Sequence, residues 1–146
     1  MKSSLLPFKF GQNNDILFEK LLYFSDNVVD AIYDENYIYV RTIFKIIKYD
    51  SNYNVIFEIS FSLITYDFNI INNKLYVVLD MSSSSTVVIT TPHGINTYNI
   101  SAAFGGIIAF NSIGEITETK FFSSNSTSVS QAITFSNFLI NDEFIY

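Results

Sequence analysis

Apolar and polar positions alternate in short runs along most of the chain, and polar clusters separate these runs. A two-residue period of this kind predicts β-strands that bury at least one face of a sheet. Asn, Asp and Ser make most of the separating turns, since the chain has only 2 Pro and 5 Gly. No window combines helical apolar spacing with a cap and a stop, and residues 15–24 come closest. The pattern therefore predicts an all-β, antiparallel protein with almost no helix.

One two-strand unit recurs at residues 8–19 (FKFGQNNDILFE), 47–58 (IKYDSNYNVIFE) and 108–119 (IAFNSIGEITET). Each copy has an aromatic third residue, a polar tract rich in Asn, Ser and Gly, and a β-branched residue that opens a second apolar run. Because these polar residues favour tight turns, each copy is predicted to be a β-hairpin. We call this unit the outer hairpin.

A second unit lies between the copies of the first, at residues 31–39 (AIYDENYIY), 69–76 (NIINNKLY) and 138–146 (FLINDEFIY). Each copy joins two apolar strands through an Asx-rich turn and ends in Ile-Tyr or Leu-Tyr. Asn and Asp suit such turns because they tolerate a left-handed backbone. We call this unit the inner hairpin, and the two hairpin types alternate along the chain.

An inner and an outer hairpin in series give four antiparallel strands, which is the content of one β-propeller blade. The main alternative is a β-sandwich, which also uses short alternating strands. In the propeller interpretation, residues 1–146 form a single β-repeat domain of about three blade equivalents. Its expected parts are a half-blade at 5–22, a blade at 28–61, a blade at 66–122 with an insertion at 81–104, and a half-blade at 131–146.

Three blades are fewer than the roughly four to eight that close a propeller ring. The sequence thus predicts a partial propeller or one completed by oligomerisation. The two half-blades would otherwise expose unpaired strand edges, which natural proteins cover or pair. We therefore expect them to complete a mixed blade, either across a homo-oligomer or with flanking propeller sequence, so that the chain is not a free monomer.

Three segments carry a resemblance to a known family: residues 106–122 (GIIAFNSIGEITETKFF), residues 132–146 (AITFSNFLINDEFIY) and residues 90–99 (TTPHGINTYN). Together they resemble the bacterial seven-bladed β-propeller repeat. Only Gly114 keeps the turn glycine of that pattern, and Asn or acidic residues replace the glycine of the inner turn. The resemblance implies a scaffold or binding role and supplies no catalytic residues.

Charge and composition narrow the function classes. The net charge is −6 and the eight Lys and Arg residues are scattered, whereas phosphate tracking needs clustered cations. No cysteine is present, so disulfides and thiolate metal sites are excluded. No apolar run approaches the roughly 18 residues that span a bilayer, and no secretory signal is recognisable. The Ile-, Asn-, Lys-, Tyr- and Phe-rich usage is typical of AT-rich genomes and favours a virion or cell-surface component, without fixing the compartment.

Candidate chemistry is sparse. His93, the only histidine, lies in a Pro-Gly turn and is predicted to be an exposed turn residue rather than a catalytic base. The acidic pairs at 34–35 and 142–143 occupy equivalent turns, where solvated turn formers are the expected role.

Residues 50–52 offer oxygen ligands for calcium, but the equivalent turns lack the charge. The glycines at 105–106 precede a strand, not the helix that a phosphate cradle needs. We therefore assign no catalytic, cofactor or metal residue, and predict that the chain is not an enzyme.

The repeated aromatic positions allow two interpretations. They are Tyr39, Tyr76 and Tyr146 of the inner hairpins and Phe10, Tyr49 and Phe110 of the outer ones. In one, they form the core between blades, where large flat side chains fill wedge-shaped gaps. Alternatively, they form sugar-stacking platforms on one face, as in a lectin-like propeller. The mid-strand positions favour the core, and soluble glycan binding would distinguish the two.

The insertion at 81–104 is the candidate interaction segment, because insertions into repeats often map to the binding face. It is expected to hold a small hairpin that pairs 86–90 with 95–100 and projects from the ring. Deletion of residues 82–97 is then expected to leave folding intact. The predicted function is a non-enzymatic structural or binding module that uses a protein partner or a second copy of itself, with glycan recognition as the alternative. The candidate interaction residues are Ser82, Ser83, Ser84, Ser85, Pro92, His93 and Tyr98.

Overall fold

The computed structural model describes residues 3–5, 8–10, 16–18, 22–34, 36–81, 85–100 and 103–123. Within these residues every regular element is a β-strand, which confirms the all-β prediction. The strands are β1 (Ser3–Leu5), β2 (Phe8–Phe10), β3 (Ile16–Phe18), β4 (Leu22–Phe24), β5 (Val28–Asp34), β6 (Tyr37–Thr42), β7 (Lys45–Tyr49), β8 (Val55–Phe61), β9 (Thr65–Ile71), β10 (Lys74–Asp80), β11 (Ser85–Thr91), β12 (Gly94–Ile100), β13 (Ala103–Phe110) and β14 (Ile116–Ser123).

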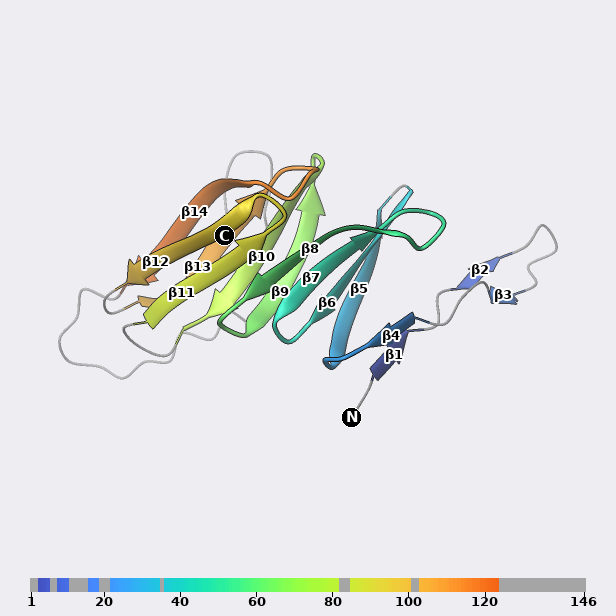
Figure 1. The fold of residues 1–146 in the computed structure, drawn as a ribbon, viewed down its shortest axis with the longest axis horizontal. Helices are drawn as coiled ribbons and strands as arrows, with labels where there is room; N and C mark the ends of the chain where they lie inside the picture. Colours follow the sequence, from blue (N-terminus) through green and yellow to red (C-terminus); the bar gives the residue numbers. More distant parts are fainter. Residues whose placement is uncertain are drawn as a thin grey trace.

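Two antiparallel sheets make up most of the described fold. The six-stranded sheet has the order β12-β11-β8-β7-β6-β5, and the four-stranded sheet has the order β14-β13-β10-β9. Figure 1 shows β5 to β8 side by side in chain order, with β9, β10, β13 and β14 in a second layer. Neither sheet closes on itself, and two sheets packed face to face are also the layout of a sandwich.

The predicted hairpins are present wherever the structure describes them. Strands β5–β6 and β9–β10 are inner hairpins, and β7–β8 and β13–β14 are outer hairpins. The first outer hairpin pairs β2 with β3, and β1 pairs with β4. The last inner hairpin, at 138–146, lies outside the described residues. The turn between β9 and β10 has Asn72 and Asn73 at φ 51° and 60°, the left-handed backbone that Asn tolerates.

The outer turn after β7 is held by one carboxylate. The Asp50 side chain accepts hydrogen bonds from the backbone N–H groups of Asn52 and Asn54, both at 2.8 Å. Its second oxygen accepts from the Asn54 amide at 3.0 Å. The Asp50 carbonyl accepts from the N–H of Tyr53, which has a φ of 62°. This turn forms because backbone N–H groups in a turn lose the partners that they would have in a strand. An Asp or Asn side chain can accept their hydrogen bonds instead.

The outer turn after β13 has the same hydrogen bonds, with Asn111 in place of Asp50. The Asn111 side-chain oxygen accepts from the N–H groups of Ile113 and Glu115, at 3.2 and 2.9 Å. The Asn111 carbonyl accepts from the N–H of Gly114 at 3.1 Å, and Gly114 takes the left-handed position at φ 84°. Two hairpins with similar sequences therefore also share a pattern of turn hydrogen bonds.

This equivalence predicts which substitutions the turn after β7 tolerates. Asp50→Ala removes all three side-chain acceptor bonds and is expected to lower the free energy of unfolding by about 1–3 kcal/mol. Asp50→Asn is expected to cost less than about 0.5 kcal/mol, because Asn111 makes the same two backbone bonds. Urea unfolding followed by circular dichroism measures both. An equal loss in both variants would mean that the charge, not the turn geometry, matters.

The main hydrophobic core lies between the two sheets. β-Branched and aromatic residues from facing strands alternate inward, as the two-residue period predicts. Phe110 is fully buried and meets Phe61 of the opposite sheet edge to face, with ring centroids 6.1 Å apart. The buried members are Tyr39, Ile46, Phe57, Ile59, Phe61, Phe68, Leu75, Val77, Leu79, Met81, Val87, Ile89, Ile108 and Phe110.

Strands β6 and β7 are buried on both faces, which explains their nearly continuous apolar sequence. Their second face packs against β4 in a separate cluster, where Phe24 meets Tyr49 edge to face at 6.5 Å. The six-stranded sheet is therefore the middle layer of the described fold. The members of this cluster are Leu22, Phe24, Ile38, Val40, Ile47, Tyr49 and Tyr53.

The insertion contains the predicted hairpin, since β11 pairs with β12 from Ser85↔Ile100 to Thr91↔Gly94. The expectation that it projects from the fold is wrong. Strand β11 also pairs with β8 and extends the six-stranded sheet. Val87 and Ile89 of this strand have no exposed surface and belong to the main core. The hairpin joins the sheet because β8 would otherwise leave its edge unpaired beside apolar side chains.

Candidate functional site

A hollow of about 400 Å³ opens where one end of the six-stranded sheet meets the turns of the four-stranded sheet. Its lining comes from four separate parts of the sequence: β6, the strand pair β7–β8, the β9–β10 turn and the β13–β14 turn. We call it the Lys48 hollow. Its lining residues are Tyr37, Tyr39, Lys48, Ile56, Asn73, Ser112 and Ile113.

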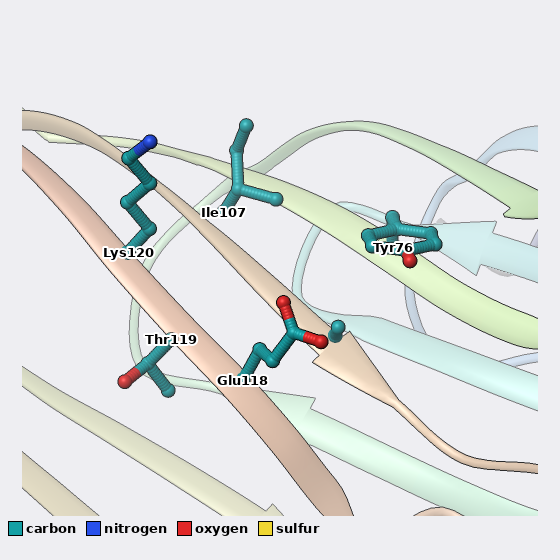
Figure 2. A pocket seen from close by; sticks show the side chains of 6 residues that line it. Tyr76, Ile107, Glu118, Thr119 and Lys120 are labelled. Carbon is teal, nitrogen blue, oxygen red and sulfur yellow. The ribbon is translucent and has the colours of Figure 1, made fainter. Parts of the chain in front are cut away.

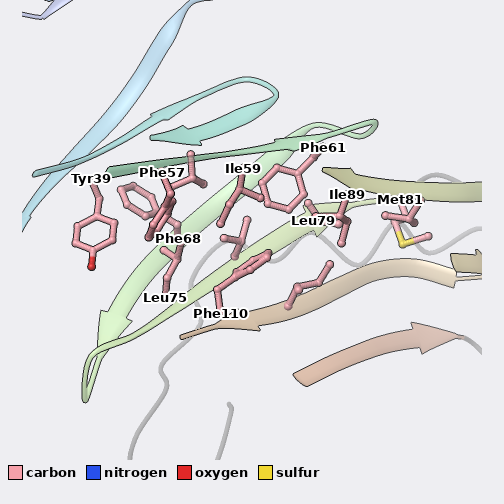
Figure 3. Packing of buried hydrophobic residues seen from close by; sticks show 14 residues of the cluster. Tyr39, Phe57, Ile59, Phe61, Phe68, Leu75, Leu79, Met81, Ile89 and Phe110 are labelled. Atoms are coloured by element: carbon pink, nitrogen blue, oxygen red, sulfur yellow. The ribbon is translucent and has the colours of Figure 1, made fainter. Parts of the chain in front are cut away.

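Lys48 is the unusual residue of this hollow, because it is a lysine with only 4% of its surface exposed. Its ammonium lies 4.0 Å from the ring centroid of Tyr37, 5.2 Å from Tyr39 and 5.6 Å from Phe57. It donates one hydrogen bond, of 3.1 Å, to the carbonyl oxygen of Ser112 in the β13–β14 turn. Figure 3 shows Tyr39 and Phe57 side by side at this end of the core. The side chain thus ties the two sheets together through aromatic faces and one carbonyl.

Burial changes the protonation behaviour around this hollow. Desolvation lowers the pKa of Lys48, and the charge of Asp34 opposes that shift only in part. Burial raises the pKa of Tyr39 to about 12, with smaller contributions from Asp34 and Tyr37. Both shifts follow from the same cause, since a low-dielectric environment disfavours whichever form carries charge.

No carboxylate pairs directly with Lys48 in the described part of the chain. The ion pairs there join Lys45 to Glu58 at 2.7 Å, Lys74 to Glu118 at 3.2 Å, and His93 to Glu115 at 3.9 Å. A buried cation is expensive unless it is paired, and aromatic faces compensate for only part of that penalty. The hollow therefore presents a lysine ammonium that aromatic faces, one carbonyl and the more distant charge of Asp34 stabilise, without an ion pair in the described part of the chain.

A second hollow, of about 300 Å³, lies on the outer face of the four-stranded sheet. Figure 2 shows Tyr76, Ile107, Glu118 and Lys120 around it, on β10, β13 and β14. One carboxylate oxygen of Glu118 forms an ion pair with Lys74. This hollow combines one aromatic ring with exposed charged groups, without a buried polar side chain.

The candidate interaction residues of the insertion do not form one exposed loop. Pro92 and His93 occupy the exposed β11–β12 turn, and Ser85 begins β11. Tyr98 is half-buried and its ring packs against Phe121, with centroids 5.6 Å apart. The sequence pattern had placed it in a projecting segment, but its neighbours belong to the core. Residues 82–84 lie outside the described residues.

His93 is exposed, as predicted, but it has specific partners. Its Nε2 lies 3.0 Å from the carbonyl oxygen of Ile113, and its Nδ1 lies 3.9 Å from a carboxylate oxygen of Glu115. The imidazole therefore joins the insertion hairpin to the β13–β14 turn. This turn forms one rim of the Lys48 hollow, so the insertion supports that rim from outside.

The repeated aromatics behave as core residues where their side chains are described. Tyr39, Tyr49 and Phe110 are buried, and Tyr76 is half-buried. The side chains of Phe10 and Tyr146 lie outside the described part. Aromatic rings packed between layers cannot also serve as open sugar platforms. Tyr39, Tyr49 and Tyr76 each line a hollow, but Tyr39 and Tyr49 are buried, so Tyr76 has the most accessible ring of these three.

The calcium interpretation of residues 50–52 finds no support in the geometry, because both Asp50 oxygens accept turn hydrogen bonds. Among the described residues no group of three or more His, Asp or Glu side chains could hold a metal ion. Residues 35, 142 and 143 of the acidic pairs lie outside the described part. Gly106 lies in β13, and a Cβ there would meet the Phe121 ring at 2.7 Å, so close packing is its role.

Sequence reasoning missed Lys48. The available signal was its position within KIIKY, a short strand whose other inner residues are apolar. A lysine at an inward position of a strand buried on both faces must be paired or functional.

The described fold defines a class: an antiparallel β protein with two face-packed sheets and a buried lysine at one end of the interface. In the described part of the chain no helix is long and apolar enough to cross a membrane. Comparison of the chain with protein-family models, curated proteins and solved structures gives no match.

Proposed function

We propose that the chain is a non-enzymatic structural and binding module built from β-propeller-type blades. The observation that supports this proposal is the repetition of a four-strand unit. Strands β5 to β8 form one antiparallel meander, and β9, β10, β13 and β14 form another. In both units the last two strands are joined by an outer turn with the same pattern of hydrogen bonds, around Asp50 and Asn111.

Blades of this type stack by their faces. The face-to-face packing of the two sheets, and of β4 against β6–β7, supports the proposal. Large apolar side chains remain exposed beside that second contact: Tyr23 is 71%, Val29 50% and Tyr33 57% exposed. We propose that this surface contacts a second copy of the chain or another protein of a virion or cell surface. An exposed apolar surface of this kind favours association with another protein chain over a free monomer.

The native mass of the purified chain tests this assembly. We expect a homo-oligomer, with a dimer that brings six blade equivalents together as the simplest form. The double variant Val29→Glu and Tyr33→Glu on β5 is expected to shift the mass to the monomer, since it places charge in the contact. Ile95→Glu on β12, where the side chain is 70% exposed, is the matched control and should leave the mass unchanged. A wild-type chain that runs as a cooperatively folded monomer would contradict the proposal.

Carbohydrate recognition is the second candidate, and the hollow beside Tyr76 favours it. An aromatic ring next to charged side chains suits a sugar, whose apolar face stacks while its hydroxyls form hydrogen bonds. A glycan array with the wild type and with Tyr76→Ala tests this. Binding that the substitution abolishes supports recognition at this hollow, and an array without signal argues against it.

A further inference from the structure

The ammonium of Lys48 has capacity for a further partner. It carries three N–H donors, of which one reaches the Ser112 carbonyl. It also contacts the faces of Tyr37, Tyr39 and Phe57, which attract a cation but are weaker partners than an anion. The charge of Asp34 acts on Lys48 as well, but Asp34 forms no ion pair with it. The strongest interaction that this group could still gain is a charge-assisted hydrogen bond to an anionic oxygen.

The walls of the Lys48 hollow show what else such a ligand must offer. Ile56 and Ile113 are 44% and 53% exposed at the hollow, and Tyr37 is 36% exposed. Asn73 and Ser112 add polar groups from two turns. The volume of about 400 Å³ lies within the range of pockets that bind small organic molecules, about 300–1,000 Å³.

We propose that the Lys48 hollow binds a small organic monocarboxylate with a flat apolar body. The carboxylate pairs with the Lys48 ammonium, and the body lies against Tyr37, Ile56 and Ile113. This site does not depend on the assembly proposed above, because all of its lining residues belong to one chain.

One negative charge fits this environment better than two. Among the described residues that line the hollow, Lys48 is the one with a cationic side chain. A phosphate dianion would bring a second charge into apolar surroundings without a second cation to pair with it. A neutral ligand would gain the apolar contacts and leave the buried ammonium as it is. A monocarboxylate satisfies both the cation and the walls.

Benzoate is the probe, and benzamide is its neutral counterpart of nearly the same shape. Amide chemical shifts of the ¹⁵N-labelled full chain report binding at Asn73, Ser112 and Ile113. We expect benzoate to shift these amides with a Kd on the order of 1 mM, as suits so small a ligand. Benzamide should bind at least about tenfold more weakly.

Lys48→Met keeps the apolar stem of the side chain and removes the charge. It is expected to weaken benzoate binding at least about tenfold and to leave benzamide binding unchanged. Lys45→Met is the matched control: the residue is on the same strand, but its ammonium pairs with Glu58 and does not line the hollow. If Lys48→Met does not fold, Ile113→Asp is the second variant. It places a negative charge at an exposed position at the mouth of the hollow and is expected to weaken benzoate binding by repelling the carboxylate.

The results that support the site differ from those that contradict it. Loss of benzoate binding in Lys48→Met or Ile113→Asp, with retention in Lys45→Met, supports the site. Equal binding of benzoate and benzamide would overturn the proposal, because the charge would then contribute nothing. Shifts at other amides, or no shift up to about ten times the expected Kd, would overturn it as well.

Discussion

Deletion of residues 82–97 is expected to unfold the protein. The deleted segment contains β11, whose Val87 and Ile89 are completely buried between the sheets. Loss of a large buried aliphatic side chain alone costs about 2–5 kcal/mol, and whole domains are stable by only about 5–15 kcal/mol. Removal of both side chains together with the strand that covers β8 should exceed this margin. The loss of a cooperative thermal transition in circular dichroism is the expected observation.

A point substitution makes the same test without shortening the chain. Ile89→Ala is expected to lower the free energy of unfolding by about 2–5 kcal/mol. Ile95→Ala, in the partner strand β12, removes the same atoms from a side chain that is 70% exposed. This control is expected to change stability by no more than about 0.5 kcal/mol. Similar small effects in both variants would restore the view of the insertion as a dispensable projection.

Phe110→Ala is expected to be the most damaging alanine substitution in the four-stranded sheet. Phe110 has no exposed surface and lies at the centre of the core between the sheets, as Figure 3 shows. Its removal should cost about 3–5 kcal/mol, because a rigid sheet interface collapses poorly around the cavity. Phe44→Ala, with 42% of the residue exposed, is the control and should cost far less. Urea unfolding curves give both values.

The partner of Phe110 allows a sharper measurement. Phe61 of β8 meets it at an interplanar angle of 82°, an edge-to-face arrangement across the two sheets. A double-mutant cycle with Phe61→Ala is expected to give a coupling energy of about 0.5–1.5 kcal/mol. Strict additivity would mean that the two rings do not interact as placed.

The features that the sequence predicted are those with local causes. Strand positions follow from a two-residue alternation that each segment carries by itself. The turns at Asp50 and Asn111 follow from side chains that bond to the backbone within a few residues, and the turn at Asn72 and Asn73 follows from the left-handed backbone that Asn tolerates. The small hairpin of the insertion was recognisable for the same reason, since two turn residues, Pro92 and His93, separate Thr91 from its partner Gly94.

The features that the sequence left open depend on contacts between distant segments. Nothing in residues 85–91 says that β11 pairs with β8, because an apolar strand matches any open edge of suitable twist. The choice between stacked blades and a sandwich is of this kind too, since both use the same strands and the same hairpins.

Lys48 illustrates this limit best. Its sequence neighbours predict a strand, but the rings of Tyr37, Tyr39 and Phe57 and the carbonyl of Ser112 reach it only after the two sheets have packed. The sequence by itself determined an antiparallel β chain of repeated hairpins with Asx turns. The tertiary structure decided which edges pair and where a charge is buried, because burial and pairing are properties of the packed layers and not of any one strand.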